Sequence, residues 1–184
     1  MSWVGHNMRP PELLQTDRLW LRRARVEDAE TIFDAYGQDL EVTRYLAWKP
    51  TGKIEDTRTH LLAARAAWEE GKAFQWVILG KGHADLLGVV GVRVDGHKVE
   101  LGYLLAKKFW GNGYMTEAVR AVVNWALDEP DCYRVWAVCD VENPASARVM
   151  EKVGMKREGI LRRWSVHPTR SDEPRDCYCY AITK

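Results

Sequence analysis

The sequence predicts a mixed α/β fold, with a mostly antiparallel sheet of about seven strands and four helices in one domain spanning residues 1–184. Two observations predict this class. Short apolar segments that suit strands alternate along the chain with stretches of helical periodicity, instead of forming separate blocks. In addition, residues 99–128 have the pattern of a strand, a glycine turn and a helix, around which the other elements are arranged.

The elements of the N-terminal half follow from residue periodicity and from turn residues. In the first strand, Leu19 and Leu21 share one face between charged residues. In the first helix, Ile32 and Tyr36 recur at helical spacing, and Gly37 is a typical C-terminal stop. The expected elements are an N-terminal tail at 1–13, a strand at 18–24, a helix at 26–36, an irregular stretch at 38–52, a helix at 54–70 capped by Thr51, and strands at 74–79 and 86–94.

The second half begins after the hairpin turn Asp95-Gly96. The strand at 99–106 has Gly102 in its middle, which predicts a β-bulge or a close approach by another backbone. The helix at 114–127 would bury Ala118 and Val122. The remaining expected elements are a strand at 135–141, a helix capped by Asn143, Pro144 and Gly154, and strands at 157–166 and 176–183 that form a hairpin around a loop at 168–174.

The turn Gly111-Asn112-Gly113 has the features of a phosphate site. Its glycines permit positive φ, so successive backbone N–H groups can converge at the positive end of the following helix. A P-loop would need Lys-Ser/Thr after the last glycine, where this chain has Tyr114 and Met115. A dinucleotide fingerprint would need a third glycine at Thr116. A coenzyme A pyrophosphate site and an ordinary strand-to-helix turn stay open.

Two segments resemble signatures of the GNAT-type acyl-CoA N-acyltransferase superfamily. Residues 108–113, Lys-Phe-Trp-Gly-Asn-Gly, are similar to its Gln/Arg-x-x-Gly-x-Gly/Ala loop, with Lys108 in place of the usual first residue. Residues 110–118 resemble the RimJ/RimL-like branch, which acetylates ribosomal-protein N-termini. Residues 143–159 resemble a second signature, with Met155 in place of an aromatic residue. The resemblance covers residues 14–184.

The resemblance implies a GNAT fold that is splayed between its fourth and fifth strands, at 99–106 and 135–141. Pantetheine of acetyl-CoA would lie between these strands, and a backbone N–H near Leu104 or Leu105 would face the thioester oxygen. No metal is implied. The implied cofactor-binding residues are Leu104, Leu105, Ala106, Lys108, Trp110, Gly111, Asn112, Gly113, Tyr114, Met115, Asn143, Ser146 and Arg148.

The same resemblance suggests candidate catalytic residues. Ser146 would donate a proton to the leaving sulfur, although it could instead cap its own helix backbone. Glu100 would be the general base, directly or through water, although it could equally pair with a cross-strand cation. Tyr103 and Asp176 are weaker candidates for the base, and Asp176 could instead form a salt bridge in a turn. The residues expected to line the acceptor site are Tyr45, Trp48, His167 and Asp176.

The composition argues against several other classes of protein. The formal charge of +1 and the lack of a dense Lys/Arg run argue against nucleic-acid or anionic-membrane partners. No apolar stretch approaches the roughly 20 residues that span a bilayer, and residues 1–12 lack a signal-peptide core. The four cysteines form no pair of CxxC motifs, so we expect free thiols and a cytoplasmic location.

The sequence therefore predicts an acetyl-CoA-dependent N-acetyltransferase that acts on a primary amine by direct attack in a ternary complex. A protein N-terminal amine is the first expectation, and a polyamine, amino sugar or amino acid is the second. An open acceptor groove would favour the peptide, and a closed pocket the small amine. A non-catalytic acyl-CoA-binding module and, more distantly, a dinucleotide-binding protein stay open. The protein could be a monomer or a homodimer.

Overall fold

A computed structural model describes residues 8–50, 52–82 and 85–184. Its centre is one eight-stranded sheet in the order β1-β2-β3-β4-β5-β6-β8-β7. Neighbouring strands are antiparallel except β5 and β6, which are parallel. The strands are β1 (Leu13–Gln15), β2 (Leu19–Arg23), β3 (Ala73–Gly80), β4 (Leu86–Asp95), β5 (Lys98–Leu105), β6 (Arg134–Asp140), β7 (Lys156–His167) and β8 (Ser171–Thr183).

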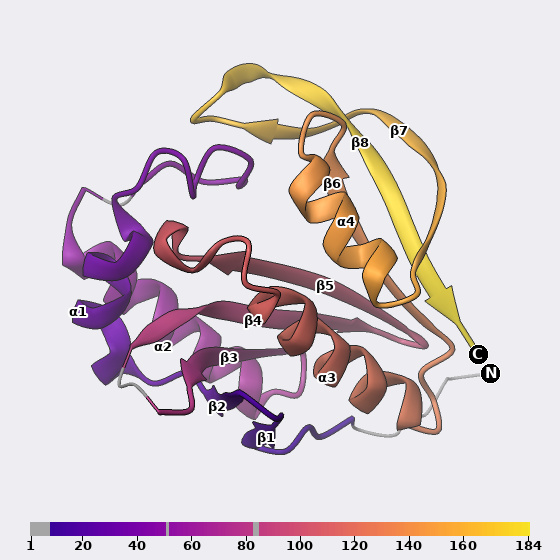
Figure 1. Ribbon diagram of the computed structural model, residues 1–184, viewed down its shortest axis with the longest axis horizontal. Helices are drawn as coiled ribbons and strands as arrows, with labels where there is room; N and C mark the ends of the chain where they lie inside the picture. Colours follow the sequence, from indigo (N-terminus) through magenta and orange to yellow (C-terminus); the bar gives the residue numbers. More distant parts are fainter. Residues whose placement is uncertain (1–7, 51, 83–84) are drawn as a thin grey trace.

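Helices cover both faces of the sheet (Figure 1). The larger core cluster lies under α3, where Val122 and Ala118 are fully buried against strand residues such as Val99. A second hydrophobic cluster lies on the opposite face of the sheet, where Tyr36 and Leu61 pack against strand residues. The helices are α1 (Ala29–Ile32), α2 (Ile54–Glu69), α3 (Tyr114–Asp128) and α4 (Pro144–Lys152), with 3₁₀ turns η1 (Val26–Asp28) and η3 (Lys107–Phe109) and a π turn η2 (Phe33–Gly37).

The sheet divides between β5 and β6. Their parallel pairing covers three positions and ends at Glu100↔Trp136. Beyond that pair β5 continues to bond β4 as far as Gly88↔Leu105, whereas β6 continues to bond β8 as far as Asp140↔Cys177. The expected splay between these two strands is confirmed, and it leaves two strand edges that face each other without a shared ladder.

Gly102 corrects one expectation. The β4–β5 ladder keeps its register through Gly91↔Gly102, so there is no bulge at Gly102, and a Cβ placed there would meet nothing within 4 Å. The close backbone approach lies instead at Gly88, whose added Cβ would be 2.2 Å from the carbonyl oxygen of Leu104. Gly88 is therefore required so that the end of β5 can pack against β4.

Other differences have local causes. β1 begins at the last residue of the expected tail, where the sequence predicts no strand; it pairs with β2 at Leu14↔Leu21 and is too short to show an alternating pattern. The expected helix at 26–36 is divided into η1, α1 and η2. The expected loop at 168–174 is mostly strand, because bulges let Pro174 pair with Val166 at the edge of the sheet. Thr51, the expected cap of α2, lies outside the described residues.

The four cysteines are free, as expected from the sequence. In the described ranges, none of the helices combines the length and the apolar character needed to cross a lipid bilayer.

Candidate active site

The turn before α3 presents unsatisfied backbone donors. Gly111 and Gly113 have φ of 80° and 76°, and Gly113 is the N-cap of the helix. No side chain caps this helix, and its first backbone bond runs from the N–H of Glu117 to the carbonyl of Gly113. The preceding N–H groups, from Tyr114 to Thr116, have no helical acceptor. They point along a fifteen-residue dipole and suit the two phosphates of coenzyme A.

Side chains around this turn hold it in place. Glu117 accepts hydrogen bonds from the Thr16 hydroxyl at 2.6 Å and from the backbone and side chain of Arg18 at 2.9 and 2.6 Å. Burial opposes its charge, but these donors outweigh burial and lower the pKa of Glu117. Lys108 pairs with Asp85 at 2.9 Å. Glu117 is thus structural and links the turn between β1 and β2 to α3.

Four other predicted cofactor contacts have distinct positions. Trp110 is 46% exposed, and its indole N–H donates to the carbonyl of Leu105 at 2.7 Å. The Asn112 amide donates to the Trp110 carbonyl at 3.0 Å. Met115 packs its side chain in the core, so its contribution to a ligand is limited to its backbone N–H. Arg148 is exposed on α4.

Strand pairing distinguishes among the donors at the end of β5. The N–H of Ala106 donates to the Leu87 carbonyl at 2.8 Å, so it is not available to a ligand. Backbone groups alternate in direction along an antiparallel ladder, so Leu104 also faces β4. The N–H groups of Leu105, Tyr103 and Leu101 therefore face the open edge toward β6. Leu105, rather than Leu104, is placed to face a thioester oxygen.

Tyr103 and Ser146 bridge the diverging strands. The Tyr103 hydroxyl donates to the Ser146 carbonyl at 3.1 Å, and it lies 2.9 Å from Ser146 Oγ, where either hydroxyl can be the donor. The Ser146 N–H donates to Asn143 Oδ1 at 3.1 Å, which makes Asn143 the N-cap of α4. The Ser146 hydroxyl therefore faces Tyr103 from across the divided sheet.

The environment of this pair decides what Tyr103 can do. Burial raises the pKa of Tyr103, and the hydrogen bond with Ser146 offsets this only in part. Burial also raises the pKa of the nearby Cys139 thiol to about 12, with a smaller opposing contribution from its hydrogen bond with Ser146. Both groups stay protonated at neutral pH. A tyrosine that stays protonated is poorly suited to act as a general base, whereas its hydroxyl can act as a hydrogen-bond donor.

The two carboxylates proposed as bases lie apart from this pair. Glu100 sits opposite Arg93 on β4, with 3.2 Å between its Oε2 and the guanidinium, and its side chain is 35% exposed. Asp176 accepts from the Arg163 N–H at 2.9 Å and from Arg162 at 2.5 Å, and both contacts lower the pKa of Asp176. Because Arg163 adopts a φ of 47° in a bulge of β7, Asp176 clamps that bulge. Asp176 therefore forms a structural salt bridge, as the sequence allowed.

The loop at 38–50 is hydrogen-bonded to the segments that follow β6 and β7. The Tyr45 hydroxyl donates to the Glu142 carbonyl at 2.7 Å and accepts from Arg170 at 2.8 Å. Arg170 also pairs with the Glu142 carboxylate. Trp48 follows in the same loop and is 38% exposed. Sequence reasoning missed Arg170 and Glu142, since no local pattern links Tyr45 to a residue 125 positions away.

His167, which was expected to line the acceptor site, is buried. It is 5% exposed and lies 6.4 Å from the Tyr45 ring, 3.6 Å from Asp140 Oδ2 and 4.0 Å from Cys177 Sγ. Burial lowers the pKa of His167, although the Asp140 carboxylate opposes that effect. Cys177 is fully buried with a raised pKa, so this contact is not a nucleophile–base pair. His167 borders the loop at 38–50 as a neutral packed ring.

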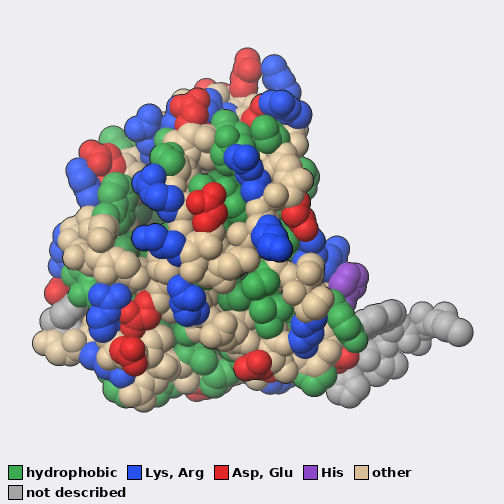
Figure 2. Space-filling model, turned by 45° about the vertical axis from the view of Figure 1, so that its right-hand side comes forward, with side chains coloured by type: hydrophobic (Ala, Val, Ile, Leu, Met, Phe, Trp, Pro, Cys, Tyr) green, Lys and Arg blue, Asp and Glu red, His purple; other side chains and the backbone are tan. Residues whose placement is uncertain are grey.

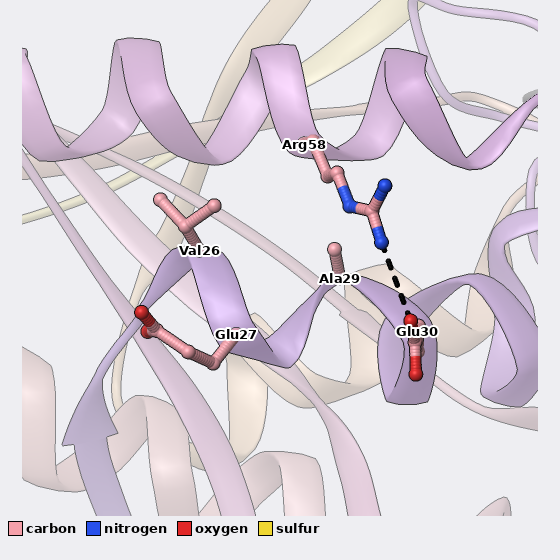
Figure 3. Close-up of a pocket in the computed structure, with 5 residues that line it drawn as sticks. All are labelled: Val26, Glu27, Ala29, Glu30 and Arg58. Carbon is pink, nitrogen blue, oxygen red and sulfur yellow. Dashed lines mark hydrogen bonds and ion pairs between the residues drawn. The ribbon is translucent and has the colours of Figure 1, made fainter.

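The described surface also has hollows away from the divided edge of β5 and β6. A hollow of about 340 Å³ between η1, α1 and α2 is lined by Val26, Glu27, Ala29, Glu30 and Arg58, and it holds one exposed ion pair (Figure 3). Figure 2 shows basic and acidic side chains interspersed, in keeping with a formal charge of +1.

Comparison with known proteins decides the family. The Acetyltransferase (GNAT) domain model matches residues 18–156. The chain belongs to the GNAT acetyltransferase family. An uncharacterized N-acetyltransferase of Bacillus subtilis, YoaA, is 31% identical over 94% of this chain and 97% of its own length. The [ribosomal protein uS5]-alanine N-acetyltransferase of Escherichia coli is 25% identical over 86% of each chain.

Solved GNAT structures share the fold. A GNAT-family acetyltransferase from Bacillus anthracis has a TM-score of 0.80 and 30% identity, covering 93% of this chain and 98% of its own. RimL, a ribosomal L7/L12 α-N-protein acetyltransferase in complex with coenzyme A, has a TM-score of 0.84 and 21% identity, covering 94% and 98%.

The protein is thus an N-acetyltransferase that uses acetyl-CoA. The uncapped donors of α3 fit its phosphates, and the open edges of β5 and β6 fit the amide groups of pantetheine. When bound, acetyl-CoA supplies the acetyl group as a thioester.

Proposed function

We propose that this GNAT enzyme acetylates the α-amino group of a protein N-terminus by direct attack in a ternary complex. The observation that carries the acceptor assignment is the exposure of β5 at Gly102, which leaves an open sheet face next to the donor site. An open face suits an extended chain, whereas a small amine needs enclosure to gain affinity. The E. coli relative, named for a ribosomal-protein alanine, points the same way.

In this proposal, three groups of the chain act on the reacting atoms: the Leu105 N–H, the Ser146 hydroxyl and the Glu100 carboxylate. The Leu105 N–H stabilises negative charge on the thioester oxygen as the acceptor nitrogen bonds to the carbonyl carbon, and one such donor contributes roughly 3–4 kcal/mol. The Ser146 hydroxyl passes a proton to the sulfur as the carbon–sulfur bond breaks, and it regains a proton from the acceptor nitrogen, which carries a surplus proton after its attack. Glu100 takes the ammonium proton through a chain of waters, since it lies five residues along β5 from Leu105, on the exposed face, where it pairs with Arg93.

Asn143 and Tyr103 position the proton donor. Asn143 fixes the start of α4, and Tyr103 orients the Ser146 hydroxyl. When the Tyr103 hydroxyl donates to Ser146 Oγ, the serine proton is free to point at the sulfur. Tyr45, Trp48 and His167 form the far wall of the acceptor site in this proposal.

Thiol release from acetyl-CoA tests the function. Peptides with a free Ala or Ser N-terminus are compared with the same peptides blocked by acetylation, and with spermidine, glucosamine and free amino acids. We expect release with the free peptides and none with the blocked ones. Release with the small amines alone would overturn the peptide assignment and leave the acetyltransferase activity standing.

A further inference from the structure

Two glycines form a strip of bare backbone in the middle of the sheet. Gly91 of β4 and Gly102 of β5 lie directly opposite each other, so they share one face. That face is opposite to α3, because the alternating neighbours Val99 and Leu101 are buried in the α3 core. Gly102 is exposed although β5 is a central strand, and a Cβ there would meet nothing within 4 Å. Nothing in the described chain covers this point.

Side chains on the same face frame the strip. At one end, Glu100 and Arg93 form their cross-strand ion pair. At the other end the next same-face pair is Leu104 with Val89. On the β3 side, Gln75 lies opposite Gly91 and its amide oxygen is 3.1 Å from the ring of His60 on α2. The strip is therefore a floor with one charged end, one apolar end and a polar side.

The floor adjoins the reacting end of the donor site. Gly102 lies between Leu101 and Tyr103, whose N–H groups face the open edge of β5, and it is three residues, or about 10 Å, from Leu105. The α3 side of this edge is filled by core residues and by the contact between Tyr103 and Ser146. An amine can approach the acetyl group from the glycine face, where Glu100 also lies.

We propose that the Gly91–Gly102 pair is the floor of the acceptor site and that Gly102 determines acceptor specificity. The absence of side chains lets the backbone of an extended peptide lie flat on the sheet, with its amino group at the β5 edge. A side chain at position 102 would stand in that path. This inference rests on the proposed function and names the part of the site that selects its substrate class.

Gly102→Val and Gly102→Ala test the inference, with Gly159→Val as the matched control. Gly159 also lies on an exposed strand of the same sheet, its φ is not positive, and a Cβ there meets nothing within 4 Å, but it is on β7. Valine suits a strand, and its Cβ meets nothing within 4 Å at either position, so both variants should fold. Each variant is assayed for melting temperature, acetyl-CoA dissociation constant, and kcat/KM with a free N-terminal peptide and with a small amine.

We expect Gly102→Val to lower kcat/KM for the peptide by about tenfold or more, since displacement of a reactant by an ångström can cost as much as about a hundredfold. Gly102→Ala should have a smaller effect, and Gly159→Val should match the wild type. Unchanged acetyl-CoA binding in all three confirms that the donor site is intact.

The outcomes separate this inference from the proposed function. Peptide acetylation by Gly102→Val at the wild-type rate would overturn the inference and leave the function standing. A wild-type enzyme that acetylates small amines alone, with an equal loss in Gly102→Val, would overturn the peptide class and retain the floor. A wild-type protein that binds acetyl-CoA but acetylates no amine would overturn both.

Discussion

Removal of the Ser146 hydroxyl tests the proposed proton donor in the most informative way. Among the described residues, the hydroxyl meets the Tyr103 hydroxyl at 2.9 Å and the Cys139 thiol, so few other bonds change in Ser146→Ala. A hydrogen bond to a charged sulfur is worth about 2 kcal/mol, which corresponds to about a 30-fold lower kcat. Ser146→Thr keeps the hydroxyl and should recover much of the rate.

Tyr103→Phe provides the second arm of a double-mutant cycle. It removes one neutral hydrogen bond, worth about 1 kcal/mol, so kcat should fall about fivefold. Because Tyr103 acts through Ser146, the double variant should lose about 30-fold rather than the roughly 150-fold expected for independent effects. Thiol release at saturating acetyl-CoA measures kcat, and thermal unfolding controls for stability. A wild-type kcat in Ser146→Ala, or full additivity in the double variant, would refute the reasoning.

Three further predictions concern the scaffold. Gly113→Ala places a side chain at a φ of 76°, which costs about 1–2 kcal/mol and should lower the melting temperature by roughly 2–8 °C while weakening coenzyme A binding; an unchanged melting temperature would contradict this. Asp140→Ala leaves the Arg175 guanidinium without its buried partner, which should lower the free energy of unfolding by about 3–5 kcal/mol and the melting temperature by roughly 6–20 °C. The control Glu173→Ala removes an exposed ion pair and should melt like the wild type. Burial lowers the pKa of His167 in the folded state, so its contribution to stability is present above its unfolded pKa of about 6.5 and is lost as the pH falls below that value. Urea titrations at two pH values, one on each side of this pKa, measure the loss of stability. The loss should be smaller in His167→Gln than in the wild type.

The sequence allowed the donor site to be predicted because its signals are local. Gly113 must adopt a positive φ whatever packs nearby, and Asn143 before Pro144 begins a helix through its own side chain. The order of elements from β2 to β8 followed from periodicity for the same reason. The open edge of β5 then followed from the family resemblance and from the pairing of its strands.

The acceptor side was harder to predict because it is made by contacts between distant segments. His167 has the sequence context of a turn, yet the loop at 38–50 and Asp140 cover it. The link from Tyr45 to Arg170 has no counterpart in any local pattern. Gly102 was expected to mark a bulge or a close backbone approach and marks neither, because periodicity does not show what covers a strand.

The central claim is that acetyl-CoA binds the α3 turn and the open edge of β5. Amide NMR of the labelled protein, titrated with acetyl-CoA, measures it residue by residue. We expect large shifts and slowed exchange at Leu105 and at residues 111–116, while Leu104 and Ala106, whose N–H groups face β4, keep their exchange rates. Changes confined to other residues, or equal changes with NAD, would contradict this claim.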